Sequence, residues 1–339
     1  MNRSASLPIL AVIAAISAFA PVVHAQYPTT SIGTFTGGDA GEGLDLDGTI
    51  LYAVDMGPNA ASTAVRDATF TDENATVGVT VVAINTLAFG SANYGSSTDD
   101  NNLEYVMNTI RWTPLVNGGQ VTVTLANLTP GLVYKLQLLF NENCCNRGFD
   151  VFAEGSLIAD EFSPYALQGG TNQSIGAVIT HTFVAGDTTL DILLDGNPAS
   201  FSDRNPILDA LSLESLGNAP VLSNVVATPS VEDPTVEISG NIADLDAGDS
   251  FLLTVDWGDG SVPETFNYPP GTTSFLESHT YSTYTLFEIT VTLEDDTGAQ
   301  AAPATVTANV APFVPALDET GLVLLMLGLA FAATRLIRR

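Results

Sequence analysis

The sequence contains very little positive charge. It has nine Lys and Arg residues against 38 Asp and Glu residues, a formal net charge of −29, and Lys135 is its one lysine. Proteins bind nucleic acids and anionic lipids through Lys and Arg, so we exclude nucleic acid as a partner. Hydrophobic residues make up 45% of the chain, which excludes a disordered protein, because disorder requires low hydrophobicity.

The sequence also offers few residues for catalysis. Outside the N-terminal apolar segment it has two histidines, His181 and His279, which are not spaced as a zinc-binding pair. It lacks the Gly-x-Ser-x-Gly motif of serine hydrolases, and no pair of carboxylates stands out as suited to glycoside hydrolysis. We therefore predict that the protein is not an enzyme, and that His181 faces outward from a strand.

The N-terminal segment is typical of a secretory signal peptide. Residues 1–25 contain a basic start at Arg3, an apolar run and a small residue at Ala25. We predict cleavage before Gln26 and export from the cytoplasm. An uncleaved membrane anchor is the alternative.

The C-terminal segment, VPALDETGLVLLMLGLAFAATRLIRR (314–339), joins an apolar run to a basic end. The run covers residues 321–334, which is shorter than the roughly 20 residues that span a bilayer comfortably. The segment resembles the IPTL-CTERM sorting signal of Gram-negative bacteria, in which a short Ile-Pro-Thr-Leu-like motif precedes an apolar helix and an arginine cluster. The matching residues are Val314, Pro315, Ala316, Leu317, Arg335, Arg338 and Arg339.

This resemblance implies a route to the cell surface. A short transmembrane helix would hold the protein transiently in the inner membrane, with its basic end in the cytoplasm. Export and C-terminal processing machinery would then release or transfer the protein to the cell surface or the extracellular space. A permanent single-span anchor is the alternative.

Between the two ends, short runs of residues alternate with the period of β-strands. In QVTVTLA (120–126) the apolar residues fall on one face, and in VYKLQLLF (133–140) Lys135 and Gln137 fall on the opposite face from the apolar ones. Clusters of Gly, Asn, Asp and Pro separate such runs and are typical of turns. The pattern predicts an all-β fold of antiparallel sandwiches. Only DDNNLEYVMNTIRW (99–112) indicates a helix, and the strand order of residues 33–119 is not fixed.

The first domain is predicted at residues 28–216. Its segments GLVYKLQLLFNE, RGFDVFAEG and NPILDALSLESL resemble malectin-like and related carbohydrate-binding jelly rolls, and the likeness covers residues 120–214. It implies a jelly-roll β-sandwich that binds carbohydrate. No sugar-contacting residue can be matched one by one, and residues 33–119 carry no motif of that family.

A second domain is predicted at residues 219–312, after the turn-rich segment SLGNAPVLSN. The segments VDWGDGS (255–261), SHTYS (278–282) and ITVTLEDDTG (289–298) resemble a PKD domain, an immunoglobulin-like β-sandwich. The resemblance implies a spacer, or a module that contacts proteins or glycans. Trp257 is expected to anchor its core.

The loop NENCCNRGFD holds the two cysteines of the chain. In an oxidising compartment they should pair, and a bond between neighbours would be strained because adjacent Cα atoms lie about 3.8 Å apart. We predict a disulfide between Cys144 and Cys145; reduced thiols or intermolecular pairing are the alternatives. Polar groups beside a flat sulfur surface suit a pair of sugar hydroxyls. The candidate ligand-binding residues are Glu142, Asn143, Cys144, Cys145, Asn146 and Arg147. In the alternative interpretation, Arg147 ties this loop to the sandwich edge with Asp203.

Two acidic clusters could bind calcium, a cation that takes six to eight oxygen ligands. The first cluster contains Asp39, Glu42, Asp45 and Asp47. The second contains Asp244, Asp246 and Asp249, with Asp295 and Asp296 expected nearby in the folded sandwich. Neither cluster matches an EF-hand loop, and solvated turns are the alternative in so acidic a chain. Calcium is the one cofactor that the sequence suggests.

These observations predict an exported, non-enzymatic protein of the cell surface or extracellular matrix. Its first domain would bind a glycan, such as exopolysaccharide or envelope sugar, with the second domain as a spacer. The alternatives are a structural or adhesive matrix protein that makes protein–protein contacts, or a glycoside hydrolase. A concave face lined with aromatic residues would favour the glycan, and a flat acidic face would favour the matrix protein.

Overall fold

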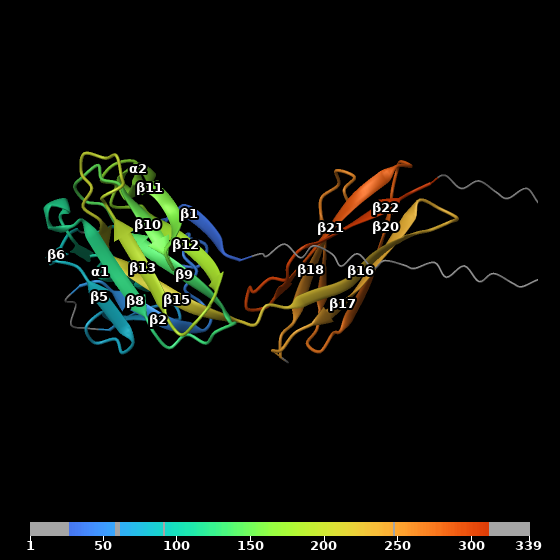
Figure 1. The fold of residues 1–339 in the computed structure, drawn as a ribbon, viewed down its shortest axis with the longest axis horizontal. Coiled ribbons are helices and arrows are strands. Elements are labelled where there is room, and N and C mark those ends of the chain that lie inside the picture. Colours follow the sequence, from blue (N-terminus) through green and yellow to red (C-terminus); the bar gives the residue numbers. More distant parts are fainter. Residues whose placement is uncertain (1–26, 58–61, 91, 247, 312–339) are drawn as a thin grey trace, which may run out of the picture.

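The computed structural model describes residues 27–57, 62–90, 92–246 and 248–311. The predicted signal peptide, the sorting segment and residue 312 lie outside these ranges. The regular structure of the described residues is mostly β-strand, with two short α-helices, α1 (Thr98–Val106) and α2 (Pro164–Gln168), and one 3-10 turn at Leu115–Asn117. The all-β prediction is confirmed (Figure 1). Neither helix in these ranges has the length and apolar character needed to cross a membrane.

The first domain is built on a seven-stranded sheet. In order across the sheet, its strands are β1 (Thr29–Phe35), β12 (Gly176–Val184), β9 (Val133–Phe140), β15 (Ala210–Gly217), β2 (Ile50–Asp55), β4 (Ala68–Asp72) and β3 (Thr63–Val65). All neighbours pair antiparallel except β2 and β4.

Two smaller sheets complete this domain. One has the order β11 (Ser156–Phe162), β10 (Phe149–Ala153), β13 (Leu190–Asp195), β8 (Gln120–Leu125) and β5 (Val79–Val82). The other has the order β14 (Ile207–Leu208), β7 (Thr109–Trp112) and β6 (Asn85–Ala88). The five-stranded sheet packs on the seven-stranded sheet through the apolar faces that the sequence predicted. The contributors from β9 and β8 include Leu136, Leu138, Phe140, Val121, Val123 and Leu125.

The second face of β9 is buried as well, which the alternating pattern did not predict. Residues 33–119 supply a second apolar cluster that packs on Leu139, and it includes Phe35, Phe70 and Leu103. Gln137, expected to face outward, is only 2% exposed, and its Oε1 accepts a hydrogen bond from the backbone N of Asp45 at 3.2 Å.

Helix α1 begins where the sequence supplies a capping box. The Ser97 side chain accepts from the backbone N of Asp100 at 2.9 Å, and the Asp100 carboxylate accepts from the backbone N of Ser97 at 3.2 Å. The helix therefore occupies only the first half of the segment predicted to be helical. The second half, from Thr109, is strand β7.

The prediction that His181 faces outward is wrong. The His181 ring is buried in the first domain, stacks on Phe183 with ring centroids 5.6 Å apart, and lies 2.8 Å from the Thr30 hydroxyl. Burial lowers the pKa of His181 below its ordinary value. The ring is part of the apolar packing, because β12 turns it to the same face as Ile179.

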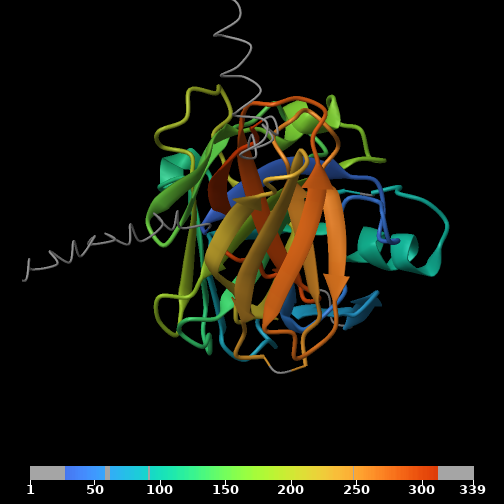
Figure 2. The ribbon, with the colours of Figure 1, turned by 90° about the vertical axis from the view of Figure 1, so that its right-hand side faces the viewer.

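The second domain is a sandwich of two sheets, and Figure 2 shows it in front in a view along the long axis. One sheet has the order β16 (Val221–Pro229), β17 (Thr235–Ala243) and β20 (Ser274–Thr280). The other has the order β19 (Glu264–Tyr268), β18 (Phe251–Asp256), β21 (Leu286–Asp295) and β22 (Ala304–Asn309). Trp257 is fully buried in the core between them, as predicted.

The two domains meet through a few specific contacts. Val133 of the first domain, Leu216 at its end and Ala299 of the second domain form a small buried cluster. The backbone N of Gln300 donates to the Tyr27 hydroxyl at 3.0 Å. The junction between the domains is therefore ordered by contacts from both sides.

Candidate functional site

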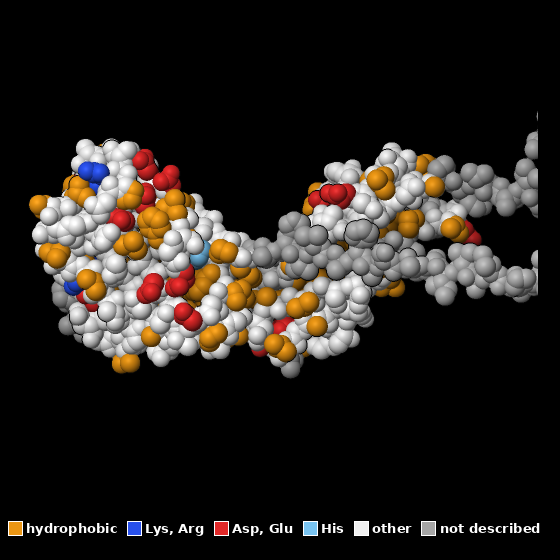
Figure 3. Space-filling view, viewed as in Figure 1, with side chains coloured by type: hydrophobic (Ala, Val, Ile, Leu, Met, Phe, Trp, Pro, Cys, Tyr) orange, Lys and Arg blue, Asp and Glu red, His pale blue; other side chains and the backbone are white. Residues whose placement is uncertain are grey.

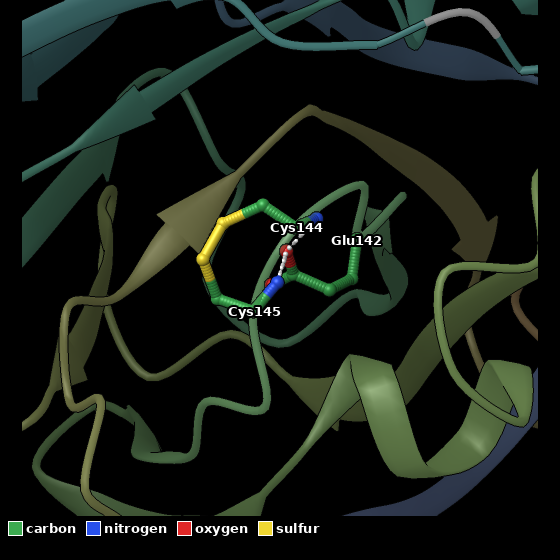
Figure 4. Close-up of side chains that lie close together, drawn as sticks. All are labelled: Glu142, Cys144 and Cys145. Atoms are coloured by element: carbon green, nitrogen blue, oxygen red, sulfur yellow. Dashed lines mark hydrogen bonds between the residues drawn. A yellow bond between two sulfur atoms is a disulfide. The ribbon is translucent and has the colours of Figure 1, made fainter.

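The loop between β9 and β10 is organised around the side chain of Glu142, which is fully buried. Its Oε1 accepts hydrogen bonds from the backbone N of Cys144 at 2.8 Å and of Cys145 at 2.9 Å, as Figure 4 shows. Its Oε2 accepts from Nε of Arg147 at 2.5 Å. One carboxylate thus fixes the backbone of both cysteines and the direction of the arginine.

Arg147 is also buried, with 4% of its surface exposed. Its guanidinium donates to the backbone O of Asn205 at 2.9 Å and lies 3.5 Å from Sγ of Cys144. It also lies 4.0 Å from a carboxylate oxygen of Asp203, the residue that the alternative interpretation named. The sequence placed Glu142 and Arg147 among the ligand-binding candidates, but the structure buries both, so they hold the loop in place from beneath its surface.

A layer of buried polar side chains supports the loop from below. Gln168 accepts from the backbone N of Glu142 at 2.7 Å and donates to the Asn141 side chain at 3.3 Å. Asp209 accepts from the backbone N of Asn141 at 2.9 Å. Buried hydrogen bonds of this kind hold a loop in one conformation.

The outer surface of the loop combines sulfur, amides and aromatic rings. The structure joins Sγ of Cys144 and Cys145 in a vicinal disulfide, shown in yellow in Figure 4. Asn143, Cys144 and Asn146 are exposed, and Cys145 is half-buried. The half-buried rings of Phe89 and Phe201 lie nearby: Phe89 is 5.7 Å from the Arg147 guanidinium, and Phe201 covers Gly148. We call this surface the disulfide platform; its members are Asn143, Cys144, Cys145, Asn146, Phe89 and Phe201.

Sequence reasoning found four of these six residues. Phe89 and Phe201 were missed because they reach the loop from distant parts of the chain, and no local pattern marks them. Tertiary pairing brings them in: Asn143 donates to the backbone O of Phe89 at 2.5 Å, and Arg147 forms a parallel bridge with Asp203, two residues after Phe201.

Asp209 has a buried carboxyl group at this end of the domain. Its side chain is 0% exposed, and its Oδ1 has no hydrogen-bond partner. Burial raises the pKa of Asp209 well above its ordinary value, and the carboxylates of Glu142 and Asp55 raise it further. A raised folded-state pKa adds stability that is complete below the unfolded pKa of about 3.9 and is lost as pH rises through the folded value.

We therefore expect Asp209→Asn to become more stable than the wild type as pH rises from 4 to 7. The gain at neutral pH should be about 1–3 kcal/mol, because an amide does not titrate and avoids the pH-dependent cost of burying this carboxyl. Chemical unfolding at several pH values measures this, with exposed Asp160→Asn as the control. A stability difference that does not change with pH would contradict the assignment.

A second surface of interest is the outer face of the five-stranded sheet. It carries a hollow of about 430 Å³, whose lining includes Phe152, Leu193, Asp191 and Thr124. The hydroxyl of Thr124 donates to Asp191 at 2.6 Å. Figure 3 shows hydrophobic and acidic side chains side by side on this face of the first domain. The lining of the hollow contains one aromatic ring, so it matches only in part the aromatic-lined concave face expected for glycan binding.

The structure divides the first acidic cluster. Asp39 and Glu42 lie together with Asp100, and their carboxylate oxygens are within 4.8 Å of one another. Asp45 instead pairs with Lys135 at 2.5 Å, and Asp47 pairs with Arg66. Burial, followed by the neighbouring Asp100, raises the pKa of Glu42. Both Asp100 oxygens already accept backbone hydrogen bonds, from Gly38 and Ser97.

The structure brings the second acidic cluster together, with Asp295 and Asp296 nearby as expected from the sequence. Asp244, Asp246 and Asp249 lie together, and Asp249 also lies with Asp295 and Asp296, within 4.8 Å in each group. Burial and the neighbouring Asp295 and Asp296 raise the pKa of Asp249 to about 6. Burial likewise raises the pKa of Asp295 and of Asp244. We call these five residues the junction aspartates.

Comparison with known proteins assigns no family. No family model matches the chain, and no curated protein is similar to it in sequence. Among solved structures, the PKD1 domain of Vibrio anguillarum Epp is 22% identical over 28% of this chain and 95% of its own, with a TM-score of 0.22. A chain in the crystal structure of the plant peptide RALF23 in complex with FER and LLG2 is 15% identical over 49% of this chain and 48% of its own, with a TM-score of 0.35.

A β-D-mannosidase from Dictyoglomus thermophilum is 8% identical over 56% of this chain and 29% of its own, with a TM-score of 0.24. Identities and scores this low say nothing about activity or ligand.

Proposed function

We propose that this protein is an exported, non-enzymatic binding protein whose first domain engages a glycan through the disulfide platform. The observation that carries the proposal is the exposed disulfide of Cys144 and Cys145, fixed from beneath by the buried Glu142 and Arg147 pair. The ligand class is a neutral or basic polysaccharide of the envelope or the surrounding matrix, because the chain carries a net charge of −29.

The chemistry of the platform suits a sugar ring. Sugars present apolar C–H faces and pairs of hydroxyls, and binding sites for such ligands combine flat apolar surfaces with a few placed polar groups. The sulfur pair and the rings of Phe89 and Phe201 offer the apolar surface, and the amides of Asn143 and Asn146 offer donors and acceptors. A surface already held in one conformation loses less entropy on binding, which favours affinity.

The remainder of the chain fits a surface role. The second domain, with its PKD-like segments, would act as a spacer, and its compact sandwich is suited to that. The segments at residues 1–25 and 314–339 support export, transient anchoring in the inner membrane and release to the cell surface. The disulfide requires an oxidising compartment, which agrees with export.

We expect the full chain to bind a subset of glycans on an array, and the double variant Cys144→Ser/Cys145→Ser to lose that binding at least tenfold. Treatment of the wild type with a thiol reductant should have the same effect, with folding checked by circular dichroism. Phe152→Ala, on the outer sheet face, is the matched control and should bind as the wild type does. Loss of binding in Phe152→Ala alone would move the site to the hollow.

The same preparation separates the alternatives. A structural or adhesive matrix protein would show no glycan binding and would self-associate in sedimentation experiments. A glycoside hydrolase would release reducing sugar from a bound polysaccharide. Either result would replace the proposed function.

A further inference from the structure

The junction aspartates lie where the two domains join. Asp244, Asp246 and Asp249 belong to the segment between β17 and β18, and Asp295 and Asp296 stand at the end of β21. The two segments are far apart in the sequence, and the sandwich brings their carboxylates together. We propose that these five residues bind one divalent cation, calcium, and that this ion fixes the segment connecting the domains.

Three carboxylate oxygens of the junction aspartates are buried without a hydrogen-bond partner. Asp295 is 4% exposed; its Oδ1 accepts from the backbone N of Thr297 and of Ala299, both at 2.9 Å, while its Oδ2 accepts from no group. Oδ2 of Asp244 and Oδ2 of Asp249 are also shielded from solvent without a hydrogen-bond partner. Buried polar atoms are nearly always satisfied, so three such oxygens in one cluster indicate a ligand that supplies positive charge.

The junction aspartates lack a positively charged partner in the part of the chain that the structure describes. Within the described ranges, no ion pair includes any of the five aspartates. Carboxylates this close repel one another, and a divalent cation removes that repulsion. Calcium suits the site better than magnesium, because it accepts many carboxylate ligands in irregular loops, whereas magnesium keeps several of its waters.

The junction aspartates also contact the segment that connects the two domains. Asp246 accepts from the backbone N of Asn218 at 2.7 Å and from its side-chain amide at 3.0 Å. The backbone N of Thr297 donates to Asp295, and the hydroxyl of Thr297 donates to the backbone O of Leu216. Asp246 therefore holds Asn218 directly, and Asp295 holds Leu216 through Thr297, so an ordered ion site orders the connection.

The first acidic cluster differs on the decisive point. No oxygen of that cluster is both buried and unpartnered among the described residues. We propose no ion there.

Calorimetric titration of the full chain in detergent micelles with calcium chloride, after treatment with chelator, tests the binding. We expect saturable binding of one ion, with magnesium at least tenfold weaker. Asp249→Asn and Asp295→Asn should each weaken the calcium affinity at least tenfold. Glu232→Gln removes the same charge from an exposed site of the same domain and should leave the affinity unchanged. No binding at millimolar calcium, or equal weakening by Glu232→Gln, would overturn the site.

Limited proteolysis of the connection tests the coupling. Calcium should slow cleavage between residues 216 and 220 at least tenfold in the wild type and have no such effect in Asp249→Asn. Binding without this protection would overturn the role at the junction while leaving an ion site. This test is independent of the proposed function, because the proteolysis is done without glycan and the cleaved segment is not part of the disulfide platform.

Discussion

The variant Glu142→Ala should lose about 3–5 kcal/mol of the free energy of unfolding of the first domain, the cost of breaking a buried ion pair. The Arg147 guanidinium, 4% exposed, would be left without its closest carboxylate. The backbone N–H groups of Cys144 and Cys145 would lose their acceptor as well. Denaturant unfolding monitored by circular dichroism measures the loss.

Two further variants interpret the result. Glu142→Gln keeps the side-chain length and an oxygen that can accept from both cysteine amides, so it should lose less than Glu142→Ala. Asp160→Ala removes an exposed carboxylate from the same domain and should change stability by less than about 0.5 kcal/mol. If Glu142→Ala were as stable as Asp160→Ala, the loop would not depend on the buried pair.

The second large effect is expected in the other domain. Trp257→Ala should destabilise it by about 3–5 kcal/mol, because truncating a buried aromatic residue leaves a cavity. Trp257 is 0% exposed, its ring stacks on His279 with centroids 5.0 Å apart, and its backbone O accepts from the Tyr281 hydroxyl at 2.9 Å. In a domain of this size the melting temperature should fall by more than about 10 °C.

Differential scanning calorimetry can assign this change to one domain. The transition of the second domain should move to lower temperature while that of the first domain stays in place. Trp257→Phe is the matched variant: it fills much of the same space and removes the indole Nε1, which is buried without a partner, so it should lose far less. Equal losses in the two variants would show that the cavity is not the cause.

The strands were predictable from the sequence wherever one face meets the core and the other meets water. In β8 the residues Val121, Val123 and Leu125 alternate with half-exposed threonines, and the period of two was sufficient. The same rule misjudged β9, because residues 33–119 cover its second face, and a strand buried on both sides loses its alternation. The orientation of His181 was predicted wrongly for a related reason. A pattern of apolar and polar residues assigns a polar side chain to the solvent face even where it packs in the core.

The candidate site was predictable where residues adjacent in the sequence carry the chemistry. The disulfide platform was located through its neighbouring cysteines, and the second acidic cluster through closely spaced aspartates. The roles of Glu142 and Arg147 required the structure, because burial and hydrogen-bond saturation depend on residues such as Gln168 and Asn205 elsewhere in the chain. The contribution of Asp100 to the first cluster was hidden for the same reason.

The strand order of the seven-stranded sheet also determines when the first domain can close during synthesis. Thr29 of β1 pairs with Thr182 of β12, and Asp55 of β2 pairs with Ala210 of β15. Synthesis starts at the N-terminus, so β1 and β2 are made long before their partners β12 and β15. Pairings between segments this far apart in the sequence form slowly. Their open edges could meanwhile join those of other chains. Mutual repulsion between chains with a net charge of −29 opposes such encounters until β15 arrives.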